Sequence, residues 1–251
     1  MRKLVLYLKV FAVAAVTVLI MTACPYIYDD IDTKGIPKFV SVNYIDLSQK
    51  DEYGHYLISQ ISPFRSSEGH DYSDDFENNR TMKHYFYRPN SKTKVYSPVS
   101  GTVIRIMKES SETFGRQMHI ASDLYPSFVF VICHFEPVKD FVFGEKVSEG
   151  QLLGHHTRSE YTVASDIVVN VHTSKGFKLI SYFETLTPQA LKPFTDRYSV
   201  SNPGRDFLED VIITKAQRDS YPLTVKKDEL YSNADGDPWP KYIYLDLPYP
   251  Y

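Results

Sequence analysis

The sequence lacks several features that would point to whole classes of function. It has no block of basic residues and no acidic tail, and its net charge is -3 over 251 residues, so no nucleic-acid partner is expected. No tandem repeat with a period of about 20–50 residues is visible, which excludes solenoid and propeller arrays. Glycine is scarce at 11 residues, whereas tyrosine (20) and phenylalanine (15) are abundant. Flat aromatic side chains suit a pleated, half-buried surface, so the composition favours strands over helices.

The N-terminus also lacks an apolar run of the usual transmembrane length. After Lys9 the apolar stretch lasts about 14 residues, whereas roughly 20 are needed to span a bilayer. The basic start "MRK" precedes this stretch and "TAC" ends it at Cys24, which is the arrangement of a secretory signal peptide over residues 1–23. An uncleaved anchor that spans the membrane, with Lys9 reaching one interface, is the alternative.

The end of this segment, "IMTAC", resembles a bacterial lipobox, with Met21 where that motif has leucine. The resemblance implies that Cys24 is lipidated and becomes the new N-terminus, so that a lipid tethers the rest of the chain to a membrane. The second cysteine, Cys133, then has no partner, and no disulfide is expected. We therefore predict a protein of the cell envelope that is anchored by lipidation and faces the periplasm or the outside.

Short alternating segments separated by turns dominate the middle of the chain. Examples are "KVYSPVSGTVIRIMKE" and "SFVFVICHF", which read as strands around proline and glycine turns. We predict an all-β domain over residues 61–190, built as a barrel or sandwich. Residues 24–60 are interpreted as a tether and N-terminal extension. Residues 191–251 are interpreted as an irregular, proline-rich C-terminal wrap around the core, with at most a short helix or a strand and a helix.

The order of five motifs resembles the LytM and lysostaphin-type zinc endopeptidases, which cut peptidoglycan cross-bridges. In that family a His-x-x-x-Asp pair comes first, a histidine lies in a later aromatic strand, and a His-x-His strand follows. The resemblance implies a duplicated hybrid motif, also described as a barrel-sandwich hybrid, over about half of the chain. The corresponding segments here are "GHDYSD", "VYSPVSGTVI", "VICHFEP", "VSEGQLLG" and "SDIVVNVHTSKG".

The resemblance also implies a Zn²⁺ site and roles for individual residues. His70 and Asp74 match the first motif and would be zinc ligands, and His172 would be the third. His134 would act in acid–base chemistry, and Asn170 would stand where the family has a catalytic histidine. Such a shell leaves a fourth position on zinc for a water molecule, whose pKa falls towards about 7.

The last motif departs from the family, because no His-x-His is present. Side chains alternate along a strand, so Asp166, Val168, Asn170 and His172 share one face. If "NVH" takes the place of the motif, His172 completes the zinc shell, and Asn170 donates a hydrogen bond without exchanging protons. If "DIV" sets the register, Val168 takes the ligand position and no third ligand exists. In a third alternative Asp166 is itself an oxygen ligand.

Two functions follow from this interpretation. The first is a zinc endopeptidase of cell-wall peptides, and the second is a non-catalytic member of the same fold that binds peptidoglycan or an envelope protein. The loss of the His-x-His pair favours the inactive alternative, since losing one proton-transfer group costs a factor of about 100–10,000 in rate. A lipoyl or biotinyl carrier domain is excluded, because its lysine would have to follow "VSEGQ" and the similar "IMKE" precedes it. A carbohydrate-binding sandwich outside this family is a third, more distant alternative.

Overall fold

The computed structural model describes residues 27–109, 114–157, 163–223 and 237–246. The signal peptide, Met21 and Cys24 lie outside the described residues, so lipidation stays a prediction. Over the described ranges, no helix combines the length and the apolar character that crossing a membrane requires.

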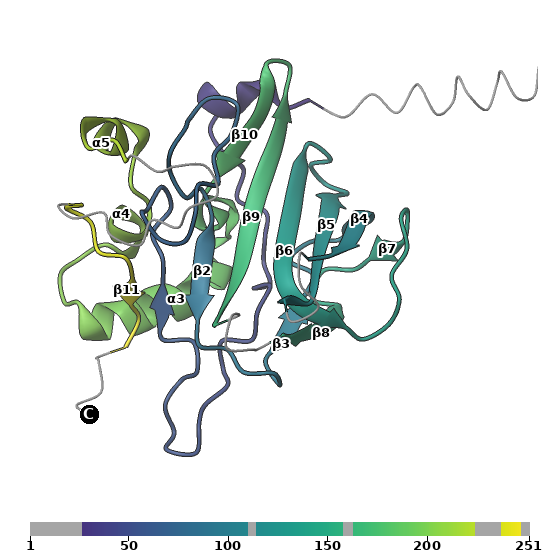
Figure 1. The fold of residues 1–251 in the computed structure, drawn as a ribbon, viewed down its shortest axis with the longest axis horizontal. Coiled ribbons are helices and arrows are strands. Elements are labelled where there is room, and N and C mark those ends of the chain that lie inside the picture. The colour runs from purple at the N-terminus through teal and green to yellow at the C-terminus, as the bar shows by residue number, and fades with distance from the viewer. Residues whose placement is uncertain (1–26, 110–113, 158–162, 224–236, 247–251) are drawn as a thin grey trace, which may run out of the picture.

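The described strands form one antiparallel sheet, which confirms the all-β class (Figure 1). The strand order is β11-β1-β2-β9-β6-β5-β4-β7, with β10 paired to β9 and β8 joining β3 to β6, so the described strands follow an open path and do not close into a barrel. The bounds are β1 Gln60–Ile61, β2 His84–Tyr87, β3 Lys94–Tyr96, β4 Gly101–Lys108, β5 Arg116–Ser122, β6 Phe128–Pro137, β7 Lys146–Val147, β8 Leu152–His156, β9 Ala164–Thr173, β10 Gly176–Ile180 and β11 Ile243–Tyr244.

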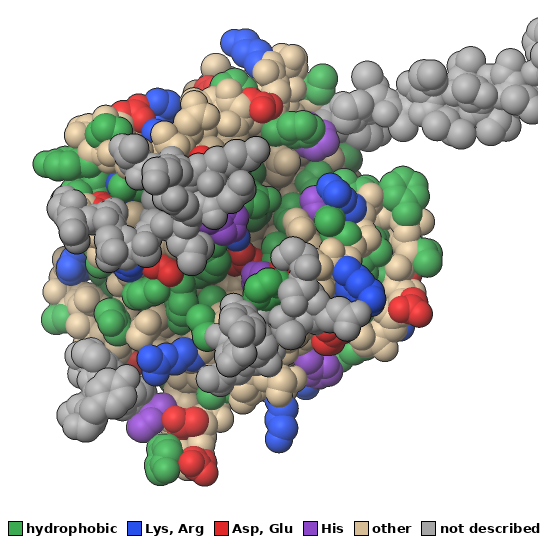
Figure 2. All heavy atoms as spheres, viewed as in Figure 1, with side chains coloured by type: hydrophobic (Ala, Val, Ile, Leu, Met, Phe, Trp, Pro, Cys, Tyr) green, Lys and Arg blue, Asp and Glu red, His purple; other side chains and the backbone are tan. Residues whose placement is uncertain are grey.

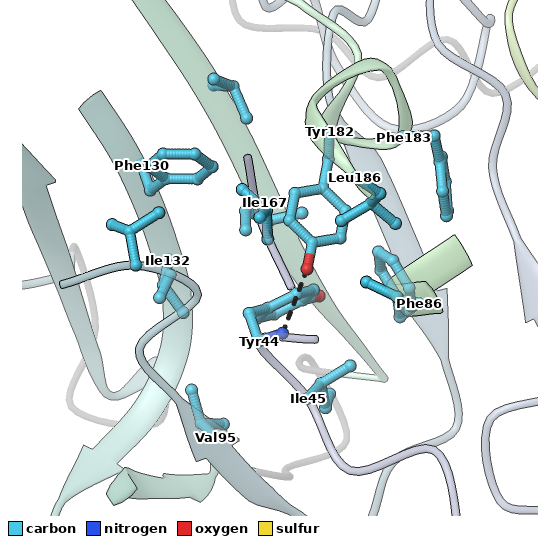
Figure 3. Close-up of a cluster of buried hydrophobic side chains, with 14 of the residues drawn as sticks. Tyr44, Ile45, Phe86, Val95, Phe130, Ile132, Ile167, Tyr182, Phe183 and Leu186 are labelled. Carbon is cyan, nitrogen blue, oxygen red and sulfur yellow. Dashed lines mark hydrogen bonds between the residues drawn. The ribbon is translucent and has the colours of Figure 1, made fainter. Parts of the chain in front are cut away.

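The main core covers one face of the sheet. Ile167, Val169 and Val171 of β9 point into it, beside alternate residues of β6. Figure 3 shows the aromatic centre of this core, where the backbone N–H of Tyr44 donates to the hydroxyl of Tyr182 at 3.2 Å. Each fully buried large apolar side chain contributes on the order of 1.5–3 kcal/mol by leaving water. This face is therefore the principal source of stability.

The segment interpreted as a tether takes part in this core. Val40, Tyr44, Ile45 and Ile58 are all buried, and Val40 forms a β-bridge to Leu186. Between Thr33 and Ser59 the chain forms turns and isolated β-bridges but no helix or strand, which agrees with the absence of a regular apolar period. A short 3₁₀-helix, η1 (Asp29–Asp32), lies at its start.

The C-terminal part is more helical than the predicted irregular wrap. It contains α3 (Pro188–Ser201), α4 (Phe207–Val211) and α5 (Lys215–Ser220), and α2 (Tyr182–Thr185) comes just before them. Pro188 sits in the first turn of α3, where a missing N–H costs nothing, and Thr187 caps the helix by accepting from the N–H of Ala190. Pro188 therefore begins this helix, and a second proline, Pro193, lies inside it.

The second face of the sheet carries a smaller core and leads to the candidate site. Val129, Val131 and Cys133 of β6 and Val168 of β9 form this core with Phe64. Because both faces are covered along the middle of β6 and β9, these strands carry apolar runs over residues 128–133 and 167–169. Asp166 is a fully buried charged side chain on this second face.

Candidate functional site

A buried ion pair lies on the second face, between β2 and β9. Lys83, just before β2, donates from Nζ to Asp166 Oδ2 at 2.5 Å. The Asp166 side chain is 0% exposed and that of Lys83 is 6% exposed. The pairing follows from the register, which places Tyr85 of β2 opposite Asp166 of β9. Lys83 Nζ also lies over the rings of Tyr72 and Tyr85, at 5.0 and 4.6 Å from their centroids.

Both groups of this pair are charged at neutral pH. Burial is the largest single influence and lowers the pKa of Lys83. The Asp166 carboxylate and the neighbouring Tyr85 and Cys133 together nevertheless raise this pKa well above its usual value. Burial raises the pKa of Asp166, whereas Lys83 and then His134 lower it, and the resulting pKa is about 2. A cation and an anion therefore face each other away from solvent, where their attraction is stronger than at the surface.

His134 of β6 is held by Glu109 in a strained backbone conformation. Its φ is +63°, a left-handed conformation that non-glycine residues seldom adopt and that is often found at functional sites. Its backbone N–H donates to Glu109 Oε1 at 2.8 Å, and its ring Nδ1 lies 2.9 Å from Glu109 Oε2. The other ring nitrogen, Nε2, lies 3.7 Å from Asp166 Oδ1. Burial lowers the pKa of His134, and Asp166 and Glu109 raise it above its usual value overall.

His70 approaches the same ion pair from the loop before β2. Its Nδ1 lies 2.9 Å from the backbone carbonyl of Asp71, which can only accept, so Nδ1 carries the proton and Nε2 is an acceptor. Nε2 lies 3.5 Å from Lys83 Nζ. Burial, and then the charge of Lys83, lower the pKa of His70, which favours the neutral imidazole.

We call these five side chains the Lys83 cluster: His70, Lys83, Glu109, His134 and Asp166. Figure 2 shows histidine, acidic and basic side chains gathered at the middle of one face, between two groups of grey residues. The raised pKa of His134 favours its protonated form beside Asp166, so positive and negative groups of the cluster offset one another. The cluster can therefore donate hydrogen bonds and bind polar groups without carrying a strong net charge.

Asp74, predicted as a zinc ligand, lies at the edge of β10 instead. Its Oδ1 accepts from the backbone N–H groups of Phe76 and Glu77, and its Oδ2 accepts from the N–H of Leu179 at 2.8 Å. The next residue, Asp75, accepts from the N–H of Phe177 at 2.7 Å. The two carboxylates thus satisfy alternate N–H groups along the outer edge of the sheet, which is a structural role.

His172 and Asn170 lie farther along β9 than the Lys83 cluster. His172 is six positions from Asp166, which is roughly 20 Å at about 3.3 Å per residue, and its ring packs against Phe177 with centroids 4.6 Å apart. Asn170 Oδ1 is buried and finds no hydrogen-bond partner among the described residues. Of the three registers considered for this strand, only the one that uses Asp166 places a polar β9 side chain beside His70 and His134.

The residues present do not fit a zinc ion. Zinc requires several deprotonated donors around one point, and here the Lys83 ammonium lies between His70 and Asp166. Over the ranges that the structure describes, no group of three or more His, Cys, Asp or Glu side chains is arranged to hold a metal. The predicted shell of His70, Asp74 and His172 is therefore not assembled.

Two members of the cluster, Lys83 and Glu109, were not predicted from the sequence. Lys83 lies in "MKHYFY", where a lysine stands among aromatic strand residues. A charged side chain inside such a strand is a signal of a buried partner. Glu109 comes directly after β4 and offers no comparable signal, because its role depends on the position of His134.

Comparisons with known proteins give structural neighbours of low sequence identity. Neither a scan against family models nor a search of the curated proteins gives a match. Similar solved structures include lysostaphin, with 15% identity over 44% of this chain and 46% of that chain and a TM-score of 0.32. They also include the catalytic domain of EnpA, a prophage-encoded M23 protein from Enterococcus faecalis, with 15% identity over 48% and 93% and a TM-score of 0.32. A third is the SpoIIQ-SpoIIIAH pore-forming complex, with 9% identity over 68% and 98% and a TM-score of 0.34.

Structures described as a glycyl-glycine endopeptidase lytM and as a peptidase M23 are also among the neighbours. The chain spans about half the length of lysostaphin. At these identities and TM-scores, residue roles do not transfer from those proteins to this chain.

Proposed function

We propose that this chain is a lipid-anchored envelope protein whose β domain binds peptidoglycan without cleaving it. Lipidation of Cys24 would hold the domain at a membrane, facing the periplasm or the outside. The Lys83 cluster would contact the peptide part of the cell wall. The proposal unites the lipobox-like N-terminus, the motif order of the sequence and the charged cluster on the second face.

The observation that carries the proposal is the Lys83–Asp166 ion pair. A zinc peptidase needs an open coordination position at which water loses a proton, and an ammonium with a high pKa supplies none. The Lys83 ammonium and the ring N–H of His134 are instead hydrogen-bond donors, which suit peptide carbonyl and carboxylate groups. The geometry therefore favours recognition over hydrolysis.

The test is cosedimentation of the full-length chain with purified cell-wall sacculi, together with dye release from labelled sacculi. The protein is expected to pellet with sacculi and to release no dye, with or without added Zn²⁺. His134→Ala should weaken binding by a factor of about 10, because one charge-assisted hydrogen bond is worth roughly 1.5 kcal/mol. The matched control His55→Ala alters a histidine of another loop and should bind normally.

Two outcomes would contradict the proposal. Zinc-dependent dye release would show that the chain is an endopeptidase. Failure of the folded protein to pellet with sacculi would exclude the binding function.

The proposed lipid anchor on Cys24 is tested by a separate experiment. In bacterial cells, Cys24→Ser should abolish incorporation of labelled fatty acid and move the protein from the membrane fraction to the soluble fraction. Unchanged membrane association of this variant would favour the uncleaved anchor, with Lys9 at one interface.

A further inference from the structure

The two imidazoles of the Lys83 cluster are oriented like metal ligands, although the Lys83 ammonium occupies the place where a metal would bind. Histidines that bind metals commonly use one ring nitrogen for the metal and fix the other by a hydrogen bond to a carbonyl or carboxylate. His70 has its Nδ1 on the carbonyl of Asp71, and His134 has its Nδ1 on Glu109. In both rings, Nε2 is the nitrogen directed towards the ion pair.

The Asp166 carboxylate makes a cation necessary at this position. It is fully buried and ionised, and an isolated buried carboxylate is strongly unfavourable. Its Oδ2 receives the Lys83 ammonium, and its Oδ1 faces His134 Nε2. Some positive charge has to lie beside Asp166 in any folded form of the chain in which this carboxylate is ionised.

We propose that Lys83 is a resident cation that replaces a divalent metal, so that the native site stays free of metal and becomes a metal site when this ammonium is removed. The donors left behind would be Asp166 Oδ2 and His70 Nε2, which both contact the ammonium now. His134 Nε2, next to the other oxygen of the same carboxylate, would be the third. Two imidazoles and one carboxylate form a donor set that suits Zn²⁺ and Co²⁺.

This inference explains why donors that are oriented for a metal form no metal group among the described residues of the native chain. The ammonium separates His70 from Asp166 and already neutralises the carboxylate. It also differs from the predicted zinc shell, because it uses Asp166 and His134 in place of Asp74 and His172. It does not depend on peptidoglycan binding, and its test uses no cell-wall substrate.

The test compares the thermal unfolding of the full-length chain and of Lys83→Ala, each in EDTA and in excess Zn²⁺. The melting temperature of the native chain should be the same in both conditions. Lys83→Ala should melt at a lower temperature in EDTA, and Zn²⁺ at about 100 times its dissociation constant should raise that temperature by roughly 5–10 °C. Co²⁺ in place of Zn²⁺ should give the visible absorption of tetrahedral coordination in the variant alone.

Two control variants assign the effect to the named donors. Lys83→Ala/His134→Ala should lose most of the zinc response, whereas Lys83→Ala/His119→Ala, altered on β5 outside the cluster, should keep it. If Lys83→Ala folds only when Zn²⁺ is present, the inference is supported. Failure of Zn²⁺ to stabilise Lys83→Ala or to restore its folding would overturn it, as would stoichiometric Zn²⁺ binding by the native chain. A negative sedimentation result with sacculi would leave this inference intact.

Discussion

The two faces of β9 are both buried, but they are built on different principles. One face presents Ile167, Val169 and Val171 to a large apolar core. The other presents Asp166, next to Lys83 and His134. Apolar packing tolerates small changes in shape, whereas a buried charge requires one particular partner. The comparison shows that one strand can supply stability from one side and a specific polar arrangement from the other.

The largest expected effect comes from removing one partner of the ion pair. Asp166→Ala leaves Lys83 as an unpaired buried charge and should lower the free energy of unfolding by about 3–5 kcal/mol. Replacing both partners, in Lys83→Met/Asp166→Leu, should cost far less, since no unpaired charge remains. Urea unfolding monitored by circular dichroism measures both values.

On the apolar face the corresponding control is Ile167→Ala, which should cost about 2–5 kcal/mol through lost burial and a cavity. This loss should not depend on pH between about 4 and 8. If the double variant were as unstable as Asp166→Ala, the contrast between the two faces would fail.

Acid should weaken the charged face selectively. The pKa of Asp166 in the folded chain is about 2, against an ordinary value of 3.8. A lowered folded pKa means that its stabilisation is present above about pH 4 and is lost as the pH falls from there towards 2. The difference corresponds to about 2 kcal/mol. Unfolding measured between pH 5 and pH 2 should show this loss in the native chain and not in Lys83→Met/Asp166→Leu.

The pKa of His134 is raised, so its contribution has the opposite sign. Its stabilisation is complete below the ordinary pKa of 6.5 and is lost as the pH rises through the higher folded pKa. The His134→Ala variant should therefore show a flatter stability profile above neutral pH. An unchanged profile would contradict the contact between His134 and its two carboxylates.

The smallest effects should come from the predicted zinc ligands outside the Lys83 cluster. Asp74→Asn removes the acceptor for the N–H of Leu179 and should cost about 1 kcal/mol. His172→Ala trims a partly exposed side chain and should change the free energy of unfolding by less than about 0.5 kcal/mol. Neither variant should alter the zinc response of Lys83→Ala. A loss of that zinc response in either variant would show that the substituted residue is a metal ligand.

The sequence predicted the class of the fold and part of the site, for identifiable reasons. Alternation and turn residues made the strands of the middle region visible. Motif order named His70 and His134 as site residues, and strand alternation placed Asp166 on the polar face of its strand as one of three open alternatives. The short helices α4 and α5 lie in the stretch where a short helix was considered, whereas the longer α3 was not predicted, although Pro188 stands in its first turn.

The partners within the site could not be predicted in the same way. Lys83 meets Asp166 only because β2 lies antiparallel to β9 in one particular register, and a residue pattern does not specify which strands are neighbours. Asp74 has the spacing of a metal ligand, but its carboxylate is used by the backbone of β10. A motif thus identifies the residue types, and the topology decides which of them meet.

The two carboxylates on β10 have a consequence for how copies of the chain meet. An uncovered outer strand offers its N–H groups to any extended segment and invites aggregation through strand addition. Asp74 and Asp75 occupy the N–H groups of Leu179 and Phe177. Two copies of the chain therefore cannot pair through these N–H groups, and the negative charge held along this edge makes self-association there unfavourable.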